Sequence, residues 1–268
     1  MKDFRMRLSS VVAILLLAAP AALFAQGRLP PGAPPAPPRT PREGAPVDLT
    51  GYWVAVVSED WRWRMLTPVP GDFQSIPLNA EGRRVGLEWD PARDEAAGMQ
   101  CKSYGAPAVM RIPGRVHISW QDDQTLKVET DAGTQTRVLH FNGPATASEA
   151  PSWQGYSVAN WERPVRGRTV GEGLAIFSGS VGQRGRSLEV TTTNLSAGYY
   201  RRNGPPYSAN ATLQEYYDYH VQPNGEEWFT VTTVVTDPTY LVGPFITSSD
   251  FKKQSNTQGW DPTPCSAR

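Results

Sequence analysis

The sequence is poor in the residues that most often carry chemistry, and it has no excess of either charge. It holds two cysteines and three histidines in 268 residues, and its 26 basic residues equal its 26 acidic residues. A protein that binds nucleic acid or an anionic membrane surface needs a basic excess to neutralise phosphate. We therefore expect neither of these partners, and the balance of charges says nothing about protein partners.

Motifs for cofactor binding and catalysis are also missing. The chain contains no His-Glu-x-x-His, Cys-x-x-Cys or Gly-x-Gly-x-x-Gly pattern, and no Gly-x-Ser-x-Gly turn marks a nucleophile. Three histidines are enough to hold Zn²⁺ with one open position. However, His117, His140 and His220 fall on separate expected strands and share their faces with unlike neighbours. We expect no metal and no cofactor.

The N-terminus is typical of an exported protein. Basic residues precede an apolar run from Val11 to Phe24, which predicts a signal peptide at residues 1–25 with cleavage after about Ala25. The apolar run is shorter than the roughly 20 residues that span a membrane. No comparable run follows it, so we expect no membrane span and a secreted or periplasmic location. Residues 26–46 are rich in proline and predict a disordered linker.

From residue 47 onward the dominant hydrophobic period is two. Short turn signals such as Pro113-Gly114 and Asn142-Gly143 join these runs and favour antiparallel neighbours. We predict a single all-β domain at residues 47–268, an antiparallel meander of about ten strands that closes into a barrel or folds into a β-sandwich. Helix-forming residues around Pro91 predict one or two short helices near residues 79–98. The expected strands are 52–57, 61–66, 108–112, 115–120, 125–130, 134–141, 155–162, 186–193, 211–221, 226–236 and 244–251.

The two cysteines, Cys101 and Cys265, lie far apart in a chain with an export signal. A disulfide between them is the natural pairing in an oxidising compartment, and it would tie the C-terminal tail to the body of the domain. Closing so long a loop contributes about 4 kcal/mol in the chain-entropy account. Two free thiols are the alternative.

One strand carries a carboxylate on an otherwise apolar face. In the strand 211–221, Glu215 shares its face with Leu213 and Tyr217. An ionised carboxylate there needs a partner or a raised pKa. Arg137, on the same face as Phe141 in its own strand, is an available counter-charge. The sequence leaves two interpretations open, which are a buried ion pair that fixes strand register and an acid that faces a ligand.

A second carboxylate ends the aromatic stretch from Trp153 to Glu162. Alternation along this strand places Glu162 on the same face as Tyr156 and Asn160. If that face points inward, Glu162 lies near the mouth of the strand layer, where it is a candidate contact for a ligand. Exposure to solvent is the alternative, because a loop begins directly after it.

Several short segments resemble known families. Asp48 to Trp53 resembles the Gly-x-Trp signature of lipocalins, and Thr236 to Tyr240 resembles their later Thr-Asp-Tyr element. The chain is longer than a typical lipocalin and carries a helical insert before Cys101. Over most of the mature domain it is similar to a widespread family of secreted bacterial β-domain proteins of unknown function. The resemblance implies a secreted, lipocalin- or calycin-like barrel and no assigned activity. It rests on the Cys101 region, Trp153 to Ser157, Trp161-Glu162, Glu215, Asp237-Pro238 and Pro244.

Three functions are compatible with these features. The first is the binding of a small apolar or amphipathic molecule in an aromatic-lined β cavity. The second is an isomerase or hydratase on the same scaffold, with Glu215 as general acid or base and Tyr217 positioning it. The third is a structural or surface-interaction protein with a filled core. The candidate ligand-binding residues are Trp120, Arg137, Phe141, Glu162, Glu215 and Tyr217.

Overall fold

The structure is a computed structural model that describes residues 39–144, 150–162 and 187–268. The predicted signal peptide and the predicted linker up to residue 38 lie outside these residues. The compact unit that contains the barrel begins at Arg39. Within the described ranges, no helix is both long and apolar enough to cross a membrane.

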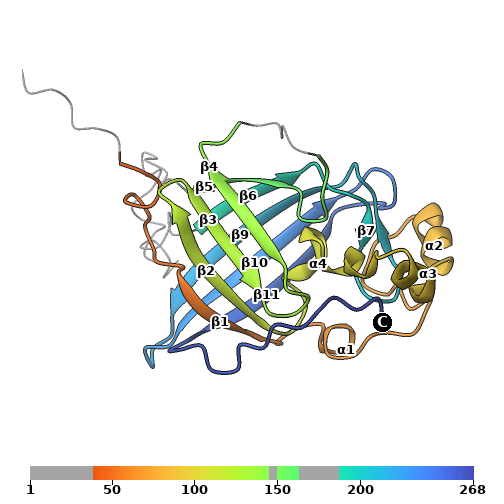
Figure 1. Cartoon of the computed structure of the whole chain (residues 1–268), viewed down its shortest axis with the longest axis horizontal. Helices are drawn as coiled ribbons and strands as arrows, with labels where there is room; N and C mark the ends of the chain where they lie inside the picture. The colour runs from red at the N-terminus through yellow and green to blue at the C-terminus, as the bar shows by residue number, and fades with distance from the viewer. Residues whose placement is uncertain (1–38, 145–149, 163–186) are drawn as a thin grey trace, which may run out of the picture. The chain divides into compact units, whose positions relative to one another are not determined.

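Nine strands form a closed barrel in which consecutive barrel strands pair with each other and the first strand pairs with the last to close the ring (Figure 1). The prediction of a mostly β domain closing into a barrel is thus confirmed. The strands are β1 (Gly51–Val56), β2 (Arg115–Asp122), β3 (Thr125–Thr130), β4 (Thr136–Phe141), β5 (Tyr156–Trp161), β6 (Ser187–Thr193), β9 (Thr212–Val221), β10 (Glu227–Thr236) and β11 (Phe245–Gln254).

The barrel is not antiparallel throughout, which corrects the expected meander. β4 and β5 run parallel, with Leu139 opposite Ser157. Strand directions cannot alternate all the way round a closed ring of nine, so at least one pair must be parallel. Fourteen residues separate Phe141 from Tyr156 in the sequence, which satisfies the dozen or so that a parallel connection needs.

Two segments expected to be strands are helical instead. Residues 61–66 contain helix α1 (Trp61–Arg64), and residues 108–112 overlap helix α4 (Ala106–Val109). Short apolar runs do not distinguish strand from helix by period alone. Pro107 occupies the first turn of α4, where its missing N–H costs nothing.

The two short helices predicted near residues 79–98 are confirmed as α2 (Ala80–Leu87) and α3 (Pro91–Ala96). Asn79 caps α2 by accepting a hydrogen bond from the Gly82 N–H, and Asp90 caps α3 in the same way. Pro91 opens α3, where its fixed φ suits the first turn.

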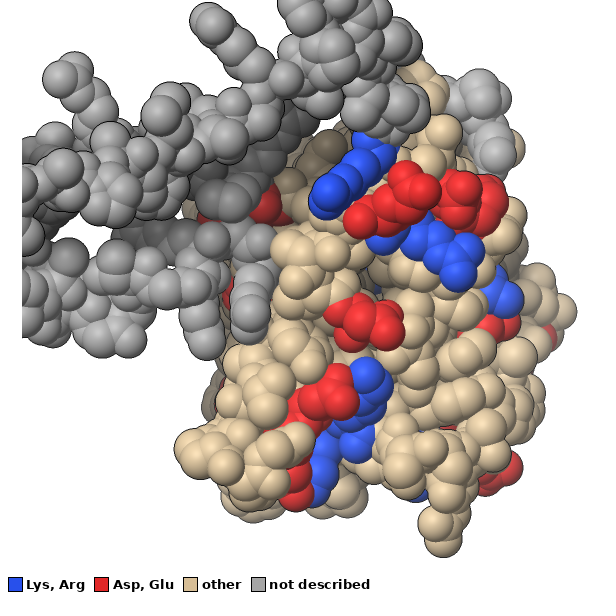
Figure 2. Space-filling view, turned by 90° about the vertical axis from the view of Figure 1, so that its left-hand side faces the viewer, with Lys and Arg blue, Asp and Glu red and all other residues tan. Residues whose placement is uncertain are grey.

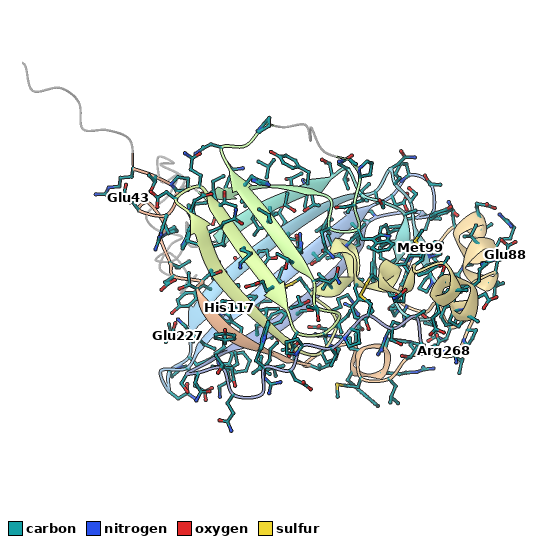
Figure 3. The ribbon with its side chains drawn as sticks, viewed as in Figure 1. Glu43, Glu88, Met99, His117, Glu227 and Arg268 are labelled. Atoms are coloured by element: carbon teal, nitrogen blue, oxygen red, sulfur yellow. A yellow bond between two sulfur atoms is a disulfide. The ribbon has the colours of Figure 1, made fainter. Side chains whose placement is uncertain are left out.

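One end of the barrel, here called the helical end, is covered by residues 57–114 and 194–211 (Figure 1). These segments hold α1 to α4, the 3-10 helix η1 (Gln100–Tyr104) and the hairpin of β7 (Gly198–Tyr199) and β8 (Pro206–Tyr207). Figure 3 shows Glu88 and Met99 at this end, and Glu43 and Glu227 at the opposite one, here called the far end. The disulfide between Cys101 and Cys265 is confirmed, and it joins η1 to the C-terminal tail.

Two hydrophobic cores result from this arrangement. The first fills the barrel, where Trp53, Tyr217 and Phe229 are fully buried and their rings pack against one another through Phe229. The second lies at the helical end and joins the covering segments to the barrel. It is built mainly from Phe73, Ile76, Leu78, Leu195, Tyr200, Tyr207, Leu213, Val235, Leu241 and Phe245.

Candidate functional site

An ion pair crosses the interior of the barrel. Arg137 on β4 and Glu215 on β9 are each 1% exposed, and two other strands separate β4 from β9 around the ring. The guanidinium binds both carboxylate oxygens, with Nη1 to Oε1 at 2.8 Å and Nη2 to Oε2 at 2.5 Å. Both oxygens of Glu215 are therefore engaged by the same partner, which is the pairing that the strand faces predicted.

Polar groups around this pair add further contacts, although Arg137 Nε has no hydrogen-bond partner among the described atoms. Arg137 Nη2 also donates to the Thr192 hydroxyl, and the Tyr217 hydroxyl lies 3.4 Å from Glu215 Oε1. Burial opposes the positive charge of Arg137, but the attraction of Glu215 outweighs it and raises the pKa of Arg137. Burial also raises the pKa of Tyr217. These contacts favour the structural interpretation of Glu215 over that of a proton-transferring acid.

Trp120 and Phe141, two of the three aromatic residues predicted to line a cavity, lie toward the far end of the barrel, whereas Tyr217 contacts Glu215 inside it. Phe141 packs between Trp120 and Trp161, with ring centroids 5.4 and 5.5 Å apart. Residues 39–46 lie against this cluster, because the Trp161 indole donates to the Pro41 carbonyl. Glu162 lines a solvent-open hollow of about 530 Å³ here, together with Phe141. Figure 2 looks at this end and shows acidic and basic side chains intermixed rather than separated into patches.

The candidate residues from the sequence thus occupy two places. Arg137, Glu215 and Tyr217 meet inside the barrel, whereas Trp120, Phe141 and Glu162 lie toward the far end. Their roles in ligand binding stay predictions.

The histidines do not meet. His117 lies on β2 (Figure 3), where it stacks on Tyr52 and contacts the Glu129 carboxylate at 3.0 Å. His140 stacks on Tyr156 instead. In the described part of the chain, no three His, Cys, Asp or Glu side chains gather as a metal site would require.

A third place, which the sequence reasoning missed, brings three arginines together at the helical end. Arg64 lies on α1, Arg111 follows α4, and Arg201 lies in the turn of the β7–β8 hairpin. They are 6%, 7% and 8% exposed, respectively. All three line one pocket, here called the arginine pocket, together with Trp63, Leu66, Thr67, Pro68 and neighbouring residues.

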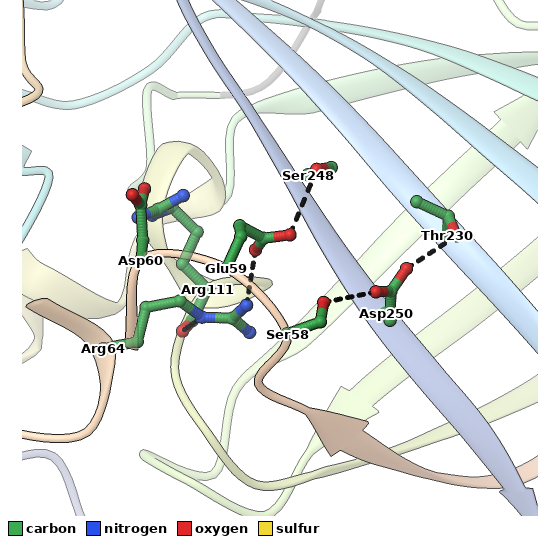
Figure 4. A network of polar contacts seen from close by, with 8 residues as sticks. All are labelled: Ser58, Glu59, Asp60, Arg64, Arg111, Thr230, Ser248 and Asp250. Atoms are coloured by element: carbon green, nitrogen blue, oxygen red, sulfur yellow. Dashed lines mark hydrogen bonds and ion pairs between the residues drawn. The ribbon is translucent and has the colours of Figure 1, made fainter. Parts of the chain in front are cut away.

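Acidic residues satisfy only part of this cluster (Figure 4). Arg64 Nη1 binds Glu59 at 2.7 Å, and Arg111 Nη2 binds Asp60 at 2.8 Å. Arg201 donates to the Gln74 carbonyl, and no carboxylate of the described residues forms an ion pair with it. The three buried cations therefore have two carboxylates in direct contact.

Each arginine also keeps a buried N–H group without a partner among the described atoms. These groups are Nη2 of Arg64, Nη1 of Arg111 and Nη1 of Arg201. Burial and the nearby Arg111 lower the pKa of Arg64 despite its contact with Glu59, and they lower the pKa of Arg201 to about 10. The fold thus holds guanidinium groups near one another at an electrostatic cost, and the three side chains line one pocket.

A faint sequence signal for this pocket exists. Arginines alternate with or follow aromatic residues in Trp61-Arg62-Trp63-Arg64 and in Tyr199-Tyr200-Arg201-Arg202. The guanidinium of Arg201 lies 5.8 Å from the centroid of the Trp63 ring, so the two segments meet in the fold. Both segments are too short to show the hydrophobic period of a strand or a helix, so the sequence does not predict that they are in contact.

The fold places this protein among mostly β proteins with a closed, mixed nine-stranded barrel. No protein-family model, curated protein or solved structure matches the chain.

Proposed function

We propose that this protein is an exported binding protein for a small amphipathic molecule, and that the molecule's anionic group enters the arginine pocket. The observation that carries the proposal is the convergence of Arg64, Arg111 and Arg201, all more than nine-tenths buried, each with an unpartnered N–H. Export is supported by the signal-like N-terminus.

A bound anion would reduce two energetic costs of the arginine cluster, which are the unpartnered N–H groups and the repulsion between the cations. A buried donor without a partner costs about 1–3 kcal/mol, and a hydrogen bond to a charged group contributes about 1.5–3 kcal/mol. A bound anion would offer acceptors to the guanidinium groups and offset the burial and the repulsion from Arg111 that lower the pKa of Arg201. Guanidinium groups match planar carboxylates especially well, because two parallel N–H groups meet two oxygens.

The size of the pocket limits what can enter it. Its volume is about 40 Å³, roughly three times the 10–15 Å³ that one water molecule needs on the same measure. That space suits a carboxylate or a similarly small anionic group. The remainder of any organic ligand would lie outside, against Leu66 and Pro68 at the pocket's rim.

Neither of the other two places supports binding as well. Inside the barrel, Arg137 and Glu215 satisfy each other, so a ligand would have to break a buried bidentate pair. The hollow at the far end is open, and its charged lining residues, Arg39 and Glu162, are at least partly exposed to water. Among these three places, only at the arginine pocket do buried cations outnumber the carboxylates that bind them.

Replacing Arg201 by Met tests the proposal. Arg201→Met keeps much of the apolar stem and removes a cation that no described carboxylate pairs. We expect the affinity for small carboxylates, measured by calorimetry with acetate and octanoate, to fall by at least about tenfold, since a charge-assisted hydrogen bond contributes 1.5 kcal/mol or more. Without ligand, the melting temperature should stay the same or rise, because functional sites commonly cost stability.

The matched control is Arg84→Met. Arg84 is an exposed arginine on α2 whose charge is paired with Glu81 and Glu88, so its loss should leave carboxylate affinity unchanged. If no carboxylate, phosphate or sulfate raises the melting temperature of the protein, the pocket does not bind anions. Equal affinity in the Arg201→Met variant would contradict the proposal as well.

A further inference from the structure

Exposed apolar residues lie close together in the sequence beside the arginine pocket, and they are here called the apolar strip. Nine large apolar side chains of the described residues are exposed, and four of them fall within residues 61–69. Scattered exposed apolar residues are ordinary, but a cluster of them marks a contact surface. The strip consists of Trp61, Met65, Leu66 and Val69, which are 67%, 58%, 70% and 70% exposed.

The strip and the pocket are continuous. Leu66 belongs to both, and Thr67 and Pro68, which lie between Leu66 and Val69 in the chain, line the pocket too. Helix α1 links the two features, because it carries the exposed Trp61 at its start and the buried Arg64 at its end, directly before Met65. A molecule whose charged end lies among the arginines therefore meets apolar side chains as it leaves the pocket.

We infer that the ligand is a single-chain anionic amphiphile, such as a medium- or long-chain carboxylate, whose hydrocarbon tail lies along Leu66 and Val69. This inference rests on the proposed function and adds the tail to it. Charge complementarity fixes the position of the head, and the small volume of the pocket forces the tail outside. The apolar strip is the surface on which such a tail loses contact with water.

The strip also sets a length. Three residue steps separate Leu66 from Val69, so their Cα atoms are at most about 10 Å apart. An extended hydrocarbon advances about 1.3 Å per methylene, given C–C bonds of about 1.5 Å. About eight methylene groups therefore reach the end of the strip, and further methylene groups would extend into water.

A soluble amphiphile fits these features better than a membrane surface. The pocket admits one small anionic group between buried arginines, whereas a membrane presents many headgroups to exposed basic residues. The chain has no basic excess to attract such a surface. The exposed arginine beside the strip, Arg62, is already paired with Asp72.

The test is a chain-length series measured by calorimetry on the purified protein. Acetate, butanoate, hexanoate, octanoate, decanoate and dodecanoate are titrated as monomers, with octylammonium as the probe of opposite charge. On an open strip that covers about half of each methylene, we expect affinity to rise about twofold per methylene, equal to about 0.4 kcal/mol. The affinity should rise about 60-fold from acetate to octanoate and should level off near decanoate. Octylammonium should not bind.

Two surface variants locate the tail. Leu66→Ser removes an apolar side chain from the strip, so octanoate affinity should fall severalfold while acetate affinity stays the same. Val221→Ser is the matched control, because Val221 is exposed at the far end of the barrel, where β9 ends, and its replacement should change neither affinity.

The outcomes separate the two proposals. If affinity depends on Arg201 but not on chain length, anion binding stands and the tail assignment is overturned. If no carboxylate of any length binds, the proposed function itself fails. Binding to anionic phosphatidylglycerol vesicles that Leu66→Ser abolishes, without any binding of monomeric octanoate, would assign the strip to a membrane surface and also overturn the inference.

Discussion

Removing the charge of Glu215 should destabilise the fold more than any surface change. Glu215→Gln keeps the size and shape of the side chain and leaves Arg137, which is 1% exposed, as a buried cation without a counter-charge. Breaking a buried pair in this way costs about 3–5 kcal/mol. The neighbouring hydroxyl groups of Thr192 and Tyr217 remain within reach, but they carry no charge to replace the carboxylate.

That loss is large compared with the stability of an ordinary domain, which is about 5–15 kcal/mol. For a domain of this size, each kcal/mol shifts the melting temperature by about 2–4 °C, so we expect a fall of roughly 6–20 °C. If Glu215 were instead a proton-transferring or ligand-facing acid without a tight partner, Glu215→Gln would abolish activity or binding and leave stability unchanged or raised.

A double variant distinguishes the pair from its separate charges. Replacing both partners in Arg137→Met/Glu215→Leu removes the two charges together, and well-packed apolar replacements of a buried pair are often neutral or stabilising by about 1–4 kcal/mol. We therefore expect the double variant to be more stable than Glu215→Gln. Glu81→Gln, which removes an exposed carboxylate paired with Arg84 on α2, is the control and should not change stability measurably.

Urea unfolding followed by tryptophan fluorescence and circular dichroism measures these differences. The midpoint should shift while the slope stays constant, because the area exposed on unfolding does not change. Two results would refute the reasoning that burial makes this pair interdependent. One is a loss of unfolding free energy below about 1 kcal/mol in Glu215→Gln, and the other is a double variant that is less stable than both Arg137→Met alone and Glu215→Leu alone.

Further predictions concern the disulfide, alkaline pH and a turn. Replacing Cys101 and Cys265 by Ser opens a loop of 164 residues, and the loss in stability should be about 4–5 kcal/mol in the chain-entropy account; an unchanged melt would contradict it. Burial raises the pKa of the interior tyrosines, so the folded state keeps protons that the unfolded state releases above pH about 10. The contribution of these tyrosines to stability should be constant below that pH and fall above it, by up to about 1.4 kcal/mol per pH unit for each tyrosine. The lowered pKa of Arg201 has the opposite sign and should offset the fall caused by one tyrosine; a flat alkaline profile would count against this prediction. Gly155→Ala should destabilise more than Gly225→Ala, because both glycines have positive φ but a Cβ at Gly155 would lie 2.5 Å from the Thr193 carbonyl oxygen; equal melts would show that the clash does not matter.

Local signals in the sequence were enough for the fold class. Strand alternation depends only on side-chain direction along the backbone, so the faces of β4 and β9 already indicated that Arg137 and Glu215 could pair. The caps of α2 and α3 are equally local, since Asn79 and Asp90 contact backbone N–H groups two or three residues away. The disulfide followed from the presence of only two cysteines.

Other features required the closed tertiary structure. The parallel pairing of β4 with β5 results from the odd number of strands, which no single strand reveals. The Arg137–Glu215 ion pair inside the barrel forms because side chains from non-adjacent strands meet across it.

The arginine pocket is a feature of this structure that the sequence did not predict. A sequence run of arginines and aromatic residues does not reveal which groups the arginines contact. Charges interact through space, and the whole fold sets the distances between them. Arg64 and Arg111 lie in the connection from β1 to β2 and Arg201 lies in the connection from β6 to β9, and only the packing of these segments over the barrel end brings their side chains to one pocket. By itself the sequence indicated the nine barrel strands, two of the helices and the favoured cysteine pairing, which depend on local period, caps and residue count. The tertiary structure decided where uncompensated charge accumulates, since burial and mutual repulsion exist only once distant segments are packed together.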